Sequence, residues 1–259
     1  MIRAAFLLLF VLGLQAARAD PATDPIQVQP TWDRAVVYAP AGTGRSRRLS
    51  TAELPGYLAD RQPLPVIVYS HGCSGIERIG HAAGEFYARN GYLFVAPDSF
   101  ARPEKPTSCQ PALRRGGLHR NVLGWRHAEI DFAIAQLRNL PGLSDAKIAL
   151  VGHSEGGIAT ATYRGAALAA RVIEGWTCQA GWSEYRGLNA PRDEPVLSLV
   201  GEDDPWFRLP ELRGDCGAFM DGNDRSVVFR KPGGLARRHW LMRDPAVREI
   251  VITFLRAQL

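Results

Sequence analysis

A serine stands between two glycines in the five residues Gly-His-Ser-Glu-Gly at positions 152–156. A serine hydroxyl becomes a nucleophile only when a neighbouring base takes its proton. The flanks support that chemistry, because an apolar run at 147–151 predicts a strand that enters the motif, and a helix is expected from Glu155 onward. Such a tight strand-to-helix turn lifts its serine above the sheet. We therefore expect Ser154 to be a nucleophile, rather than the N-cap of an ordinary glycine-rich turn.

The base must be one of six histidines. His119 and His127 precede the serine on an expected helix, and His153 is expected to point away from the reacting atom. His71 is expected to brace a loop. Only His239 follows the last expected strand, on a loop at the carboxyl edge of the sheet. We expect His239 to be the general base.

An imidazole that acts as a base needs an acid to hold its tautomer and to stabilise the imidazolium. The strand expected at 195–200 runs into Gly-Glu-Asp-Asp, which places three acids at its carboxyl end. Asp204 is the preferred partner, Asp203 is the alternative, and Glu202 is a more distant one. The resulting order of Ser154, Asp204 and His239 differs from the orders of the two main serine-protease folds.

The oxyanion that develops during acyl transfer needs two N–H donors. One is expected from Glu155, the residue after the nucleophile. The other is expected from the loop after a strand at 65–69, where the amide of Cys73 is the candidate and Gly72 allows close approach of the backbone.

The elements that must position these residues alternate along the chain. The expected strands lie at 34–38, 65–69, 92–96, 147–151, 171–175, 195–200 and 226–229, and the expected helices at 81–90, 120–140, 155–170 and from 245 to the end. Strands that alternate with helices predict parallel pairing in one sheet that is covered on both faces. The segments 41–64 and 101–118 are expected to be irregular, and 101–118 is a candidate lid.

Composition limits the class of protein. The chain has 259 residues, of which 46% are hydrophobic and 22% charged, which fits one large globular domain and not a disordered chain. The formal net charge is +5, and the only tight basic cluster is Arg45, Arg47 and Arg48. A nucleic-acid interface should show a denser basic stripe, so we expect no nucleic-acid partner.

The first 19 residues have the pattern of a leader. One arginine precedes an uncharged run at 4–14, and Ala-Arg-Ala at 17–19 forms a small-x-small cleavage signature. The run is well below the roughly 20 residues that cross a bilayer. We expect cleavage after Ala19, export to the periplasm or the medium, and a mature domain of residues 20–259 without a membrane span. The alternatives are an N-terminal anchor and a buried helix.

Export alters the interpretation of the four cysteines, because disulfides persist in an oxidising compartment. We expect Cys178 to pair with Cys216, and Cys73 with Cys109. Other pairings, or free buried cysteines, remain open. No Cys-x-x-Cys spacing is present, so no metal site is expected.

Several of these segments together resemble the α/β-hydrolase superfamily, and within it the dienelactone hydrolase-like branch. They are Val-Tyr-Ser-His-Gly-Cys-Ser-Gly at 68–75, Ala-Pro-Asp-Ser-Phe at 96–100, Val-Gly-His-Ser-Glu-Gly-Gly at 151–157 and Leu-Val-Gly-Glu-Asp-Asp-Pro at 199–205. The resemblance implies an α/β-hydrolase fold, with a mostly parallel central sheet and helices on both faces. It also implies acyl hydrolysis by a Ser-His-Asp triad without metal or organic cofactor. The dienelactone hydrolases proper carry cysteine where this chain has Ser154, so their lactone specificity does not carry over.

The expected function is that of an exported serine hydrolase that cleaves carboxylic esters, with a small-molecule ester or acyl compound as its partner. A thioesterase and a serine peptidase or amidase are alternatives on the same fold, and an inactive binding protein is the alternative of another class. Trp182, Trp206, Phe207 and Trp240 are expected near the active edge. They would line an apolar acyl pocket or, alternatively, pack on the crossover helices.

Overall fold

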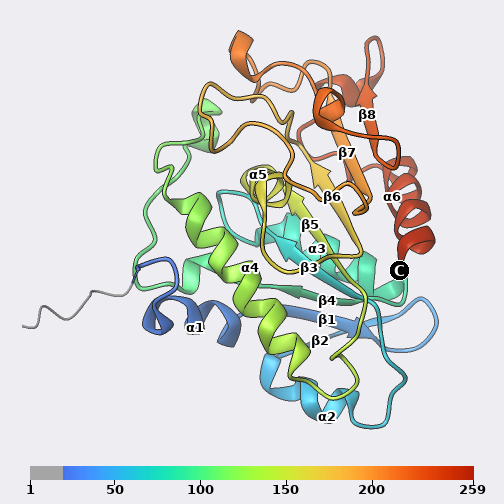
Figure 1. The fold of residues 1–259 in the computed structure, drawn as a ribbon. Helices are drawn as coiled ribbons and strands as arrows, with labels where there is room; N and C mark the ends of the chain where they lie inside the picture. Colours follow the sequence, from blue (N-terminus) through green and yellow to red (C-terminus); the bar gives the residue numbers. More distant parts are fainter. Residues whose placement is uncertain (1–19) are drawn as a thin grey trace, which may run out of the picture.

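The structure is a computed structural model that describes residues 20–259 (Figure 1). The expected leader at 1–19 lies outside the described residues. One eight-stranded sheet has the order β2-β1-β4-β3-β5-β6-β7-β8. Its strands are β1 (Val36–Pro40), β2 (Ser46–Leu49), β3 (Val66–Ser70), β4 (Leu93–Ala96), β5 (Ile148–His153), β6 (Ala170–Glu174), β7 (Val196–Gly201) and β8 (Arg225–Phe229).

The sheet is mostly parallel, as expected. β3 to β8 run parallel to their neighbours, whereas β1 pairs antiparallel with both β4 and β2. Every residue of β3 and β5 is buried. These strands are continuously apolar because helices cover both of their faces. The carboxyl ends of the parallel strands therefore meet at one edge.

Within residues 20–259, six α-helices flank the sheet (Figure 1). One core joins the sheet to α1 (Pro25–Asp33), α2 (Leu54–Leu58), α4 (Val122–Arg138) and α5 (Glu155–Thr162). The second core joins the opposite face to α3 (Glu77–Arg89) and α6 (Pro245–Gln258). Helices on both faces confirm the layer arrangement that the alternation predicted. None of the helices in residues 20–259 is long and apolar enough to cross a membrane.

The prediction was wrong in three local places. The segment 41–64 is not wholly irregular, because it contains β2 and α2. β2 is an edge strand with two exposed arginines, so it lacks the apolar run that marks a buried strand. The helix after the serine ends at Thr162 and not at 170, since Tyr163 turns extended, with φ −61° and ψ 139°. No element was expected between residues 20 and 33, but α1 forms there, and Asp24 caps it by accepting a hydrogen bond from the Ile26 amide.

The four cysteines form two disulfides, Cys73–Cys109 and Cys178–Cys216, in the expected pairing. Each bond joins loops that lie outside the strands and α-helices or in a short 3-10 turn. The bonds therefore restrain loops more than they restrain the packed core.

Candidate active site

The turn between β5 and α5 has the backbone that its glycines allow. Ser154 stands at the turn with φ 59° and ψ −119°, a conformation that L residues seldom adopt. A Cβ on Gly156 would lie 1.9 Å from the carbonyl oxygen of Ser70, and one on Gly152 would lie 2.0 Å from the carbonyl oxygen of Gly156. Only glycine fits at either position: Gly156 allows the close approach of α5 to β3, and Gly152 allows the close approach of α5 to β5.

Three side chains from distant parts of the chain meet above this turn. Nε2 of His239 lies 2.8 Å from Oγ of Ser154, and Nδ1 of His239 lies 2.6 Å from Oδ2 of Asp204. Asp204 is 3% exposed and follows β7, whereas His239 lies on the loop before α6. The partners assign the tautomer: Nδ1–H donates to the carboxylate, and Nε2 accepts from the hydroxyl. A serine in this contact can lose its proton to the imidazole.

The neighbouring acids face elsewhere. Oδ2 of Asp203 lies 2.8 Å from Nζ of Lys231, and this pair is exposed. Glu202 accepts hydrogen bonds from the Lys231 amide and from Arg230. Of the three acids after β7, Asp204 alone contacts the imidazole of His239.

Burial disfavours the charged form of the His239 imidazole. Burial lowers the pKa of His239 from the ordinary histidine value, and the hydrogen bond that His239 donates to Asp204 opposes that change. The imidazole of His153 packs edge-on against that of His239, with ring centroids 5.0 Å apart, and this neighbour lowers the pKa further. The imidazole of His239 is therefore neutral near pH 7.

Glu174 holds two parts of the site together, and the sequence analysis missed it. One carboxylate oxygen lies 3.1 Å from Nδ1 of His153, and the other accepts a 2.6 Å hydrogen bond from the Met242 amide. The side chain thus links the serine turn to the loop that carries His239. An acid at the end of an apolar strand was the available signal.

The loop after β3 approaches the serine turn. A Cβ on Gly72 would lie 3.6 Å from the Cβ of Ser154, so the backbone of this loop runs beside the nucleophile. The amide of Cys73 donates no hydrogen bond to another described residue. Cys73, Ser154 and Glu155 line the same cavity. Both expected oxyanion donors are therefore beside the nucleophile.

Arg126 is the second residue that the sequence analysis missed. It lies on α4, its side chain is 3% exposed, and its guanidinium contacts both Glu155 and the carbonyl of Gly72. The signal was an arginine four residues before Ile130, on the buried stripe of the helix.

The cavity at Ser154 has a volume of about 570 Å³ and a largely apolar wall that includes several aromatic rings. Trp182 and Trp206 line it, as expected, and the ring of Trp206 stacks on that of His239 at 5.1 Å. Trp240 does not line it, because Trp240 packs under the guanidinium of Arg78 on α3. Successive side chains of an extended segment point to opposite sides, so the side chain of Trp240 points away from the cleft when that of His239 points into it. Other apolar residues of the wall are Leu113, Leu118, Ile158, Trp176, Tyr185, Phe207, Leu209 and Leu212.

The segment expected as a lid overhangs this cleft. A bridge between Gln110 and Arg115 closes a hairpin, and residues 113–118 of it line the cavity. A Cβ on Gly117 would lie 2.4 Å from the ring of Trp182, so the segment packs directly on Trp182, which lines the same cavity. The disulfide between Cys73 and Cys109 fastens the base of this hairpin to the loop beside Ser154.

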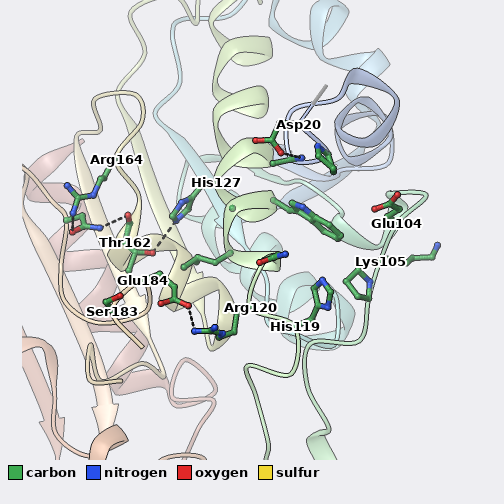
Figure 2. A pocket seen from close by; sticks show the side chains of 18 of the residues that line it. Asp20, Glu104, Lys105, His119, Arg120, His127, Thr162, Arg164, Ser183 and Glu184 are labelled. Carbon is green, nitrogen blue, oxygen red and sulfur yellow. Dashed lines mark hydrogen bonds and ion pairs between the residues drawn. The ribbon is translucent and has the colours of Figure 1, made fainter. Parts of the chain in front are cut away.

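A larger and more polar hollow of about 1240 Å³ lies between α4 and the loops around it (Figure 2). His127 reaches Thr162 there, and Arg120 forms an ion pair of 2.6 Å with Glu184. Arg120 also lies 5.2 Å over the ring of Trp182, so the two hollows share a wall. Because Ser154, Asp204 and His239 do not line the polar hollow, the smaller one is the candidate active site.

The comparisons with known proteins agree with this fold. Among solved structures, a dienelactone hydrolase from Anabaena variabilis is similar, with 17% identity and a TM-score of 0.58 over 87% of this chain and 91% of that one. A dienelactone hydrolase-like promiscuous phosphotriesterase from metagenomic libraries has 16% identity and a TM-score of 0.56 over 87% and 97%. A lidless α/β serine hydrolase from Xanthomonas campestris has 11% identity and a TM-score of 0.52 over 87% and 88%.

These structural likenesses establish the α/β-hydrolase fold. No curated protein matches the chain. The model of the dienelactone hydrolase family matches residues 54–216, which is more than half of the sequence and includes the serine turn. The chain therefore belongs to the dienelactone hydrolase family.

Proposed function

We propose that this chain is an exported serine esterase that hydrolyses carboxylic esters of small or medium size. The observation that carries the proposal is the continuous contact from Ser154 through His239 to Asp204, at 2.8 and 2.6 Å. It supplies a nucleophile, a base and an orienting anion in one line. Membership of a hydrolase family supports the same class of reaction.

In the proposed reaction, Oγ of Ser154 attacks the ester carbonyl carbon while Nε2 of His239 takes the hydroxyl proton. The carbonyl oxygen becomes an oxyanion that accepts hydrogen bonds from the amides of Cys73 and Glu155. Collapse of this intermediate breaks the ester bond, and the leaving alcohol takes the proton from His239. A water activated by His239 then releases the acid and restores the serine.

The cleft favours an apolar acyl group. Trp182 and Trp206 are the proposed substrate contacts, and Trp176 and Phe207 extend the same aromatic wall. Burial of apolar surface there favours binding by about 25 cal/mol per Å². A lone acetyl group would leave much of this wall uncovered, so longer or aromatic acyl groups should be preferred.

Export is part of the proposal. Cleavage after Ala19 would release the domain of residues 20–259, and the two disulfides are compatible with an oxidising compartment.

The test uses the purified mature chain against p-nitrophenyl esters of graded length, with matched acyl thioesters and aminoacyl amides. We expect ester hydrolysis and labelling of Ser154 by a fluorophosphonate probe. Ser154→Ala should lose both, and residual hydrolysis above about one hundredth of wild type would refute the assignment. Faster turnover of thioesters or amides would instead favour a thioesterase or a peptidase. An unlabelled, inactive wild type would favour the binding protein.

A further inference from the structure

Arg126 carries an inference beyond the triad. A buried guanidinium is costly unless its N–H groups are paired, so its partners indicate its purpose. Nε of Arg126 has no partner among the described residues. Both terminal nitrogens are engaged: Nη1 contacts His71 and the hydroxyl of Ser99, and Nη2 contacts Gly72 and Glu155. Three of these four partners lie on the segments that carry the two proposed oxyanion donors.

The first contact is with the peptide group that precedes Cys73. Nη2 of Arg126 donates to the carbonyl oxygen of Gly72 at 3.3 Å. That carbonyl and the N–H of Cys73 belong to one trans peptide, in which the two groups point in opposite directions. A donor that holds the carbonyl on the side of α4 therefore turns the Cys73 N–H to the opposite side.

His71 also holds the peptide group between Gly72 and Cys73. Its Nε2 accepts from the Ser99 amide at 3.2 Å and from Nη1 of Arg126 at 2.8 Å, so its proton is on Nδ1. Nδ1 lies 2.7 Å from the Gly72 carbonyl and donates to it. Burial and the charge of Arg126 hold the pKa of His71 well below its ordinary value, which keeps this ring neutral.

The second contact is with the residue after the nucleophile. Nη2 of Arg126 donates to Oε1 of Glu155 at 2.9 Å, and both side chains are buried. This bond anchors the first residue of α5, whose own amide is the other proposed oxyanion donor. One guanidinium thus contacts both segments that carry the proposed oxyanion donors, through the carbonyl of Gly72 and the carboxylate of Glu155.

We propose that Arg126 is the positioning residue of the oxyanion hole, and that it locks the Gly72–Cys73 peptide with its N–H toward the cleft and fixes Glu155 at the start of α5. This inference rests on the proposed function. Without the lock, rotation of the peptide would remove one donor and turn the Gly72 carbonyl toward the developing negative charge.

The test compares Arg126→Gln with Arg171→Gln. Arg171 is the matched control, because it is equally buried, pairs with Glu194 and donates to two backbone carbonyls, but does not contact the oxyanion loop. Each variant is assayed well below its own melting temperature with a p-nitrophenyl ester. Inhibition by a trifluoromethyl ketone, whose adduct with Ser154 places an oxyanion in the hole, is measured in parallel.

We expect Arg126→Gln to lower kcat by about 100-fold, with KM within about threefold, because loss of one oxyanion donor has an effect of that size. The inhibition constant of the ketone should rise by a similar factor. Arg171→Gln should lose stability but keep both constants within about threefold. An unchanged kcat in Arg126→Gln, an equal loss in Arg171→Gln, or a kcat loss without weaker ketone binding would overturn the proposal.

A second variant decides the matter if Arg126→Gln does not fold. Arg126→Lys keeps the charge beside Glu155 but cannot place two planar N–H groups on separate acceptors. It should lower kcat at least tenfold and weaken the ketone in parallel, and a kcat within threefold of wild type would overturn the proposal. Failure of the proposed function would look different, because the wild type itself would then neither hydrolyse esters nor react with the fluorophosphonate.

Discussion

Two adjacent aspartates offer a sharp test of how His239 is oriented. Asp204→Asn changes the buried partner of the imidazole, whereas Asp203→Asn changes an exposed neighbour that pairs with Lys231. The two substitutions make the same chemical change one residue apart. Any difference between them therefore reports on position in the fold.

The structure determines how an asparagine at 204 would sit. Oδ1 of Asp204 accepts a hydrogen bond from the Trp206 amide at 3.0 Å, so an oxygen must remain there. The new amide nitrogen would then face Nδ1 of His239, which lies 2.6 Å from Oδ2 in the native site. An NH₂ group forces Nδ1 to accept, so the ring proton moves to Nε2 and the ring can no longer take the proton of Ser154.

The expected loss in kcat is about 10⁴-fold, the size of the same change in a serine protease. Asp203→Asn should leave kcat/KM within about twofold, because the ion pair of Asp203 with Lys231 is exposed to solvent and Asp203 does not contact His239. The assay is steady-state hydrolysis of a p-nitrophenyl ester, with circular dichroism to verify folding. An Asp204→Asn enzyme within tenfold of wild type, or an equal loss in Asp203→Asn, would refute the reasoning.

Three further predictions follow from the same contacts. Burial lowers the pKa of His239, and only the neutral ring accepts a proton, so kcat/KM should fall on acidification with a midpoint below pH 6.5. A pH–rate profile with a higher midpoint would contradict this. Replacing Cys73 and Cys109 together with serine should lower the unfolding free energy, measured in urea, by about 3 kcal/mol. The same variant should lose more kcat/KM for long-chain esters than for the acetate ester, and equal losses for the two esters would argue against a substrate-binding hairpin. Gly156→Ala should lower the free energy of unfolding by at least about 3 kcal/mol, because the new Cβ would meet the Ser70 carbonyl. Gly124→Ala, on the open face of α4, should raise it by about 0.5–1 kcal/mol, and similar unfolding midpoints for the two variants would show that the turn tolerates a side chain.

Much of the fold could be predicted because the buried strands carry their own signal. β3, β4 and β5 are short apolar runs that end in glycine, proline or histidine, and the helices between them follow at ordinary lengths. β2 and α2 could not be predicted in this way. They lie at the edge of the sheet, where solvent accepts polar residues and the apolar pattern disappears.

The buried charges show a different limit. Arg126 and Glu174 carry polar side chains into the interior, where each is paired with a group more than twenty residues away. From the sequence pattern alone, a charged side chain is expected to lie in solvent, because the partner that would allow its burial comes near only on folding.

The amino-acid sequence alone determined the local geometry of this protein. A strand, two glycines and a helix start are contiguous, so the position of Ser154 on a strained turn follows from steric rules that act over a few residues. Only the tertiary structure decided which acid faces His239, where Trp240 points and what holds the Gly72 peptide. Each of those depends on the direction of a side chain relative to a distant segment, and a one-residue step along the chain is enough to turn it away.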